Sequence, residues 1–166
     1  MISRSSLPRS GNGIGIGMKI YVISDLHGNL DGLNPKGVDL VLVAGDFSQM
    51  SGWGPAFEEK RPGLLKERFA EIPEGLDVLL THSPPRLEGS DIDMSLDTMS
   101  PHFGSKDLTE AIRRVKPRYV FCGHIHTGDH NPAILSHADG SVTIVRNVSR
   151  LDEDYKVRYE PYLFEL

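Results

Sequence analysis

The chain of 166 residues has one cysteine, Cys122, so it lacks the pair that an intramolecular disulfide requires. Cys122 lies inside an apolar run, which favours a buried, inert thiol and a reducing, intracellular compartment. No run approaches the roughly 20 apolar residues that a transmembrane helix needs. Residues 1–17 also lack the apolar stretch of a secretory signal. These absences predict a soluble cytoplasmic protein with no membrane partner.

Positive charge is in short supply. Lysine and arginine number 18 against 23 aspartates and glutamates, giving a net charge of −5 and a pI of about 5.8. This balance disfavours general nucleic-acid binding, which depends on a basic surface. A phosphorylated ligand stays compatible with the sequence, because bound metal ions can outweigh the global charge locally.

The first 17 residues differ in composition from the rest. They are rich in Ser, Arg and Gly, and their alternating glycines miss the G-x-G-x-x-G spacing of a phosphate-binding loop. We expect residues 1–17 to form a flexible N-terminal extension and residues 18–166 to form one domain.

Short apolar runs alternate with segments of helical character in that domain. Four runs bounded by Gly, Asp or Pro predict buried strands at 20–24, 40–44, 78–81 and 119–122. Helices are predicted at 63–72 and 105–115, the second with Ser105 as its N-cap, and further strands at 142–146 and 157–166. The interleaving predicts an α/β fold with a largely central sheet.

Each of the four apolar runs ends on side chains of a kind that binds metals. In chain order these are Asp25, His27, Asp46, His82, His124 and His126. Loops at the carboxyl ends of strands are where such sheets bind ligands, so we expect these residues to converge. Members two residues apart project from the same face of an extended segment. Mixed carboxylate and imidazole ligation suits Mn, Fe, Zn, Co or Ni.

Glycine precedes two of these ligands. Gly45 and Gly123 lack a side chain and so allow the backbone to approach a crowded site closely. A single histidine at a strand end is more often a hydrogen-bonded structural residue than a ligand. The ordered set of four motifs is therefore the specific indication of a metal site.

The motifs I-S-D-L-H-G-N, V-A-G-D, L-L-T-H-S-P-P and F-C-G-H-I-H resemble four blocks of the calcineurin-like metallophosphoesterase superfamily. The chain also has a G-W-G segment before I-P-E-G-L-D, in which it is similar to the compact branch of that superfamily. The resemblance covers residues 18–166. It implies an α/β/β/α sandwich, internally shortened. It also implies hydrolysis of a phosphomonoester or phosphodiester, from a phosphorylated small molecule or nucleotide, by a hydroxide activated between two divalent ions such as manganese.

The resemblance also implies a division of the ligands. The first ion would take Asp25, His27, Asp46 and His126, and the second would take Asp46 as a bridge with His82 and His124.

One block of the superfamily, G-N-H-D or G-N-H-E, has no counterpart in this chain, which contains no Asn-His pair. In the superfamily, the Asn of this block completes the coordination of the second ion, and the His contacts the phosphate or protonates the leaving group. The omission predicts a weaker second metal site and a rate lower by about 10²–10⁴. His102, His130 and Asn29 are candidates to replace the missing groups.

The missing block keeps a second function in view. A non-catalytic metal-binding or protein-interaction module on the same fold is the alternative to a phosphatase or phosphodiesterase. The internal shortening would also expose a sheet edge, and homodimerisation is the hypothesis that would cover it.

Overall fold

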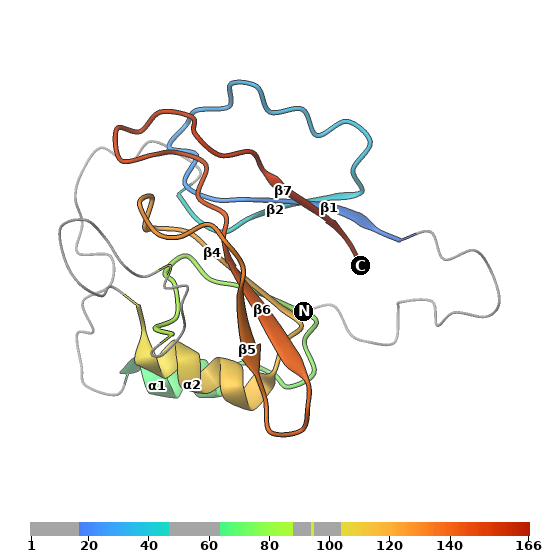
Figure 1. Cartoon of the computed structure of the whole chain (residues 1–166), viewed down its shortest axis with the longest axis vertical. Coiled ribbons are helices and arrows are strands. Elements are labelled where there is room, and N and C mark those ends of the chain that lie inside the picture. The colour runs from blue at the N-terminus through green and yellow to red at the C-terminus, as the bar shows by residue number, and fades with distance from the viewer. Residues whose placement is uncertain (1–16, 47–63, 88–93, 95–103) are drawn as a thin grey trace.

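The computed structural model describes residues 17–46, 64–87, 94 and 104–166 (Figure 1). Most of the predicted N-terminal extension, the G-W-G segment and His102 lie outside these ranges. The described residues form β1 (Lys19–Ile23), β2 (Leu40–Val43), α1 (Leu64–Ala70), β3 (Val78–Leu80), α2 (Lys106–Val115), β4 (Tyr119–Cys122), β5 (Ala133–Ser136), β6 (Val142–Asn147) and β7 (Tyr162–Glu165). This mixture of strands and helices confirms the α/β class.

The strands make two sheets rather than one central sheet. One has the order β2-β1-β7 and the other the order β3-β4-β6-β5. The pairs β1–β2, β3–β4 and β4–β6 are parallel, whereas β7 runs antiparallel to β1 and β5 antiparallel to β6. The last strand therefore lies beside the first one (Figure 1).

The segment after β6 joins the two sheets. The Val148 amide donates to the Cys122 carbonyl at the end of β4, and the Ser24 amide at the end of β1 donates to the Val148 carbonyl. Ser24 and Ser149 form an isolated parallel bridge. These bonds fix the carboxyl ends of β1 and β4 next to each other.

An aromatic core fills the space between the sheets. Phe121 of β4 is fully buried, and its ring lies 5.7 Å from that of Tyr162 and 5.2 Å from that of Phe164, both on β7. Ile20 and Val22 of β1, Ala44 just after β2 and Val148 just after β6 belong to the same cluster. Alternation along the strands sends the neighbouring positions to the opposite face.

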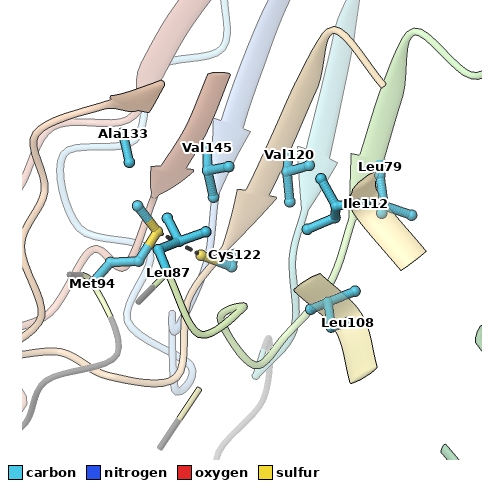
Figure 2. Packing of buried hydrophobic residues seen from close by; sticks show 9 residues of the cluster. All are labelled: Leu79, Leu87, Met94, Leu108, Ile112, Val120, Cys122, Ala133 and Val145. Carbon is cyan, nitrogen blue, oxygen red and sulfur yellow. Dashed lines mark hydrogen bonds between the residues drawn. The ribbon is translucent and has the colours of Figure 1, made fainter. Parts of the chain in front are cut away.

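A second core lies between the four-stranded sheet and the helices. Figure 2 shows its nine buried residues, which include Leu108 and Ile112 of α2 and Cys122 and Val145 of the sheet. The Ser105 hydroxyl accepts the Leu108 amide at 3.2 Å, as predicted for an N-cap. Neither described helix has the length and apolar character that crossing a membrane requires.

Both described helices lie on the four-stranded sheet. On the other sheet, an apolar cavity of about 90 Å³ forms between β1, β2 and the loop that joins them, lined by Tyr21, Ile23, Leu26, Leu30, Leu33, Pro35, Val41 and Val43. In the described part of the chain β2 is an edge of its sheet, and homodimerisation through that edge stays a prediction.

The structure differs from the sequence predictions at two strands. β5 was not predicted, because it is short and half-exposed, although the Asp139-Gly140 turn that follows it is a hairpin signal. The strand expected over 157–166 begins only at Tyr162. Pro161 lacks the amide that a sheet ladder needs, and the residues before it form a separate hairpin.

Replacing Phe121 with Ala should lower the free energy of unfolding by about 3–5 kcal/mol, because it empties the centre of the inter-sheet core. Ile134→Ala is the matched control, since that side chain is 67% exposed and should change stability by less than about 0.5 kcal/mol. Urea denaturation followed by circular dichroism measures both. Equal losses in the two variants would contradict the assignment of this core.

Candidate metal centre

The six predicted ligands come from four loops at the carboxyl ends of β1, β2, β3 and β4. Five of the six side chains form two overlapping groups, and within each group the ligand atoms lie within 4.8 Å of one another. The groups are Asp25, His27 and His126, and Asp25, Asp46 and His82. Five of the six predicted ligands therefore come together here, and their role as metal ligands stays a prediction.

The ring nitrogens face carboxylate oxygens across short gaps. Asp46 Oδ2 lies 3.6 Å from His27 Nε2 and 3.3 Å from His82 Nε2. Asp25 Oδ1 lies 3.6 Å from His126 Nε2. Two ligands held about 2.1 Å from a common ion lie about 3–3.5 Å apart. The oxygen and nitrogen donors at these separations fit divalent transition-metal ions.

The carboxylate common to both groups is Asp25. The resemblance gave the bridging role to Asp46, whose side chain also reaches histidines of both groups. The division of ligands between two ions stays a prediction.

His124 lies beside these groups without belonging to either. Its ring centroid is 4.9 Å from that of His82, and the residue is exposed. Its backbone amide donates to Asp25, 3.0 Å from each carboxylate oxygen. The structure therefore gives His124 a backbone role at the site, and its role as a ligand stays a prediction.

Asp25 is the buried anchor of the cluster, with a side chain that is 0% exposed. Its Oδ2 also accepts the Ser149 hydroxyl at 2.7 Å. Burial alone would raise the pKa of this carboxyl, but hydrogen bonds from His126, Ser149 and Ser24 outweigh it and lower the pKa to about 2. Asp25 is therefore an anion throughout the neutral range.

The histidines are set in different protonation environments. Burial opposes charge on His126, but Asp25 and the Asp152 carbonyl, 2.9 Å from Nδ1, raise the pKa of this imidazole. His124 is an exposed residue, but partial desolvation of its ring within the cluster, together with the neighbouring His82, lowers its pKa. Donation from His126 Nδ1 to the Asp152 carbonyl leaves Nε2 directed at Asp25, which is the usual orientation of a metal-binding histidine.

Two glycines make room for the cluster, as expected. A Cβ on Gly45 would overlap the His82 ring, and the φ of Gly45 is 111°, a conformation that other residues rarely adopt. A Cβ on Gly123 would overlap the Asp25 carboxylate and the Ser24 hydroxyl.

Backbone strain is concentrated at the cluster. Six described residues other than glycine have positive φ. Four are predicted ligands: Asp25, His27, Asp46 and His124. A fifth, Lys116, is the C-cap of α2, where this conformation is common. Strain of this kind persists only where the surrounding structure imposes it, and it is typical of functional sites.

Of the three candidates to replace the missing groups, the structure describes His130 and Asn29. The contacts of both lie away from the carboxylates of the metal cluster. His130 stacks on the Tyr159 ring at 3.5 Å, and its Nε2 faces the His126 carbonyl at 3.4 Å. It lines a cavity of about 310 Å³ with Arg146 and Tyr162. Asn29 uses its side-chain oxygen to accept the Asp31 amide within its own loop.

Sequence reasoning missed three groups that contact the cluster: the Ser149 hydroxyl, the Asp152 carbonyl and the Tyr155 ring. Ser149 lies within residues 18–166, which the resemblance covers, but no role was predicted for it. A backbone carbonyl has no sequence signal, and Tyr155 reaches the site only through the hairpin that carries it.

Comparison with known proteins gives related sequences. The chain is 35% identical over 116 residues to the human metallophosphoesterase domain-containing protein 1, covering 69% of this chain and 32% of that protein. It is 30% identical over 112 residues to a UPF0046 protein of Caenorhabditis elegans, covering 67% and 26% respectively. The chain thus spans about a third or less of the length of these relatives. No family model matches it.

Among solved structures, a conserved protein of Streptococcus pneumoniae described as a predicted phosphoesterase aligns with 90% of this chain and 98% of its own. The TM-score is 0.37 and the sequence identity 15%. A likeness at this level adds nothing to the sequence relationship.

Gly123→Ala should weaken manganese binding at least about tenfold, because the added methyl displaces the Asp25 carboxylate. Gly17→Ala is the matched control, since its Cβ would meet only Glu165 and Leu166 atoms at 3.4 Å or more. Calorimetric titration of the metal-free proteins measures both. Unchanged affinity in the Gly123 variant would contradict the placement of Asp25 at the metal.

Metal affinity should depend on pH through His126. A protonated imidazole cannot ligate, so affinity should fall by up to about tenfold per unit as pH drops below the raised pKa of His126. Asp25, with a pKa of about 2, stays ionised and adds no slope above pH 5. Manganese titrations between pH 5.5 and 8.5 test this, and a flat profile would refute it.

Proposed function

Because the chain belongs to the metallophosphoesterase-like superfamily, we propose that it hydrolyses phosphate esters with divalent metal ions held by this cluster. The carrying observation is the convergence of Asp25, Asp46 and three histidines from four separate loops. Bound ions would supply Lewis acidity toward the phosphoryl oxygens and an activated water for attack on phosphorus. We propose manganese, iron, zinc, cobalt or nickel, all of which suit mixed oxygen and nitrogen ligation.

The residues of the chain would hold and orient these ions. Asp25 supplies a permanent negative charge at the base, where Ser149 and the His124 amide fix its oxygens. Asp46 is the more accessible carboxylate, with a side chain that is 40% exposed, so a substrate would approach from its side. His124 is an exposed residue whose ring lies beside that of His82, and it would complete the coordination of the second ion or contact the phosphoryl group.

Protonation of the leaving group is the step for which the described residues supply no evident donor. His130 is held against Tyr159 and the His126 carbonyl. Slow turnover is the consequence, with a deficit of about 10²–10⁴ relative to a site with a placed acid. We propose a phosphorylated small molecule or nucleotide as the substrate. A good leaving group in that substrate would reduce the need for a general acid.

This same observation favours the alternative function. A site that binds metal without a placed general acid would serve equally as a non-catalytic metal-binding or interaction module. Turnover of an ester with a good leaving group separates the two functions.

Manganese-loaded protein should hydrolyse p-nitrophenyl phosphate or its bis-ester, and Asp46→Ala and His124→Ala should each reduce the rate at least about 10²-fold. Release of p-nitrophenolate measures the rate. His137→Ala is a matched control, because that ring bonds to Thr143 in the β5–β6 hairpin and should leave the rate unchanged.

Absence of metal-dependent turnover in protein that binds manganese and keeps its circular dichroism spectrum would overturn the enzyme proposal and favour the binding module. Equal rates in the Asp46 and control variants would show that activity comes from elsewhere.

A further inference from the structure

A tight hairpin over residues 151–157 stands beside the metal cluster. Leu151 and Val157 pair as an antiparallel bridge, and the Asp152 amide donates to the Lys156 carbonyl at 2.9 Å. The Asp152 side chain accepts the amides of Asp154 and Lys156 at 3.0 and 2.9 Å. These bonds close the turn from inside and fix the position of its tip.

Tyr155 is at that tip in a strained conformation. Its φ is 59°, and among the described non-glycine residues it is the one with positive φ that is neither a predicted ligand nor a helix cap. Its amide donates to the Asp152 carbonyl at 3.0 Å. The same carbonyl faces His126 Nδ1 at 2.9 Å, so one backbone oxygen joins the turn to a metal-site imidazole.

The Tyr155 ring meets two histidines of the cluster. Its centroid lies 5.0 Å from that of His27 and 5.2 Å from that of His126, with interplanar angles of 79° and 72°. Edge-to-face contacts at these distances are favourable. Tyr155 is nevertheless 55% exposed, whereas the His27 and His126 side chains are 23% and 11% exposed. Much of the ring is therefore open to solvent at the rim of the cluster.

An exposed aromatic ring held in a strained turn has no role in the cores of this fold. We propose that Tyr155 is a specificity-determining residue whose ring contacts the organic portion of a phosphate ester bound at the cluster. It would favour aryl and other planar groups over small alkyl groups. The inference rests on the proposed function in one respect, namely that the phosphoryl group binds at the metal centre.

The test uses phosphonates, which cannot be hydrolysed, so binding is measured apart from turnover. Phenylphosphonate and methylphosphonate are titrated into the manganese-loaded full chain by calorimetry. The unsubstituted protein and Tyr155→Phe should prefer phenylphosphonate. Tyr155→Gly should lose about three- to tenfold of that preference, while its manganese stoichiometry and affinity stay unchanged.

The glycine variant is chosen because glycine adopts a φ of 59° without strain, so the hairpin is kept while the ring is removed. Tyr155→Ala should show the same loss of preference. Lys156→Ala is the matched control, since it changes an exposed neighbour on the same tip whose ammonium group pairs with Asp154. Its preference for phenylphosphonate should be unchanged.

An unchanged phenyl preference in Tyr155→Gly overturns the inference, as does a tenfold or greater loss of its manganese affinity, which would make the ring a support for the ligands. Failure of both phosphonates to bind the loaded protein also overturns it. A phenyl preference that depends on Tyr155, found in a protein without turnover, supports the inference while the proposed hydrolysis fails. Turnover in a protein whose phenyl preference does not depend on Tyr155 supports the proposed hydrolysis and overturns the inference.

Discussion

The buried carboxylate of Asp25 is the constraint on which the rest of the structure depends. An unpaired charge in a protein interior costs several kcal/mol, so a side chain with no exposed surface must be compensated by its surroundings. The compensation comes from the His124 amide after β4, the Ser149 hydroxyl after β6 and the imidazole of His126. One anion thus ties together the ends of both sheets, and a bound cation would complete its neutralisation.

The cost of this arrangement is visible in the backbone around it. Asp25, His27, Asp46 and His124 all have left-handed φ values, each costing of order 1–3 kcal/mol. The two cores on either side of the four-stranded sheet offset that cost, with fully buried side chains such as Phe121 and Ile112. Rigidity in the sheets is what allows the three loops that carry these strained residues to meet at one point.

Much of this could be predicted from the sequence. Apolar runs ending on ligand residues identified β1 to β4, and the parallel-sheet rule placed their carboxyl ends together. Ser105 fulfilled its role as N-cap because capping depends on local geometry. The strands that were missed or misjudged, β5 and β7, are antiparallel partners at sheet edges, where pairing depends on tertiary context. Asp25, not Asp46, belongs to both ligand groups, and the Tyr155 ring contacts His27. Both facts depend on distances between loops that no local sequence pattern encodes.

The relatives place the chain in a metallophosphoesterase-like superfamily but share only part of their length with it, so the cluster itself must carry the functional argument. The most direct test is the number of manganese ions bound per chain at saturation, in the unsubstituted protein and in Asp25→Asn. Two ions in the former, the second bound more weakly, and fewer than one in the latter are expected, because Asp25 belongs to both ligand groups. No metal in the unsubstituted protein, or two ions in Asp25→Asn, would contradict a metal centre built on Asp25.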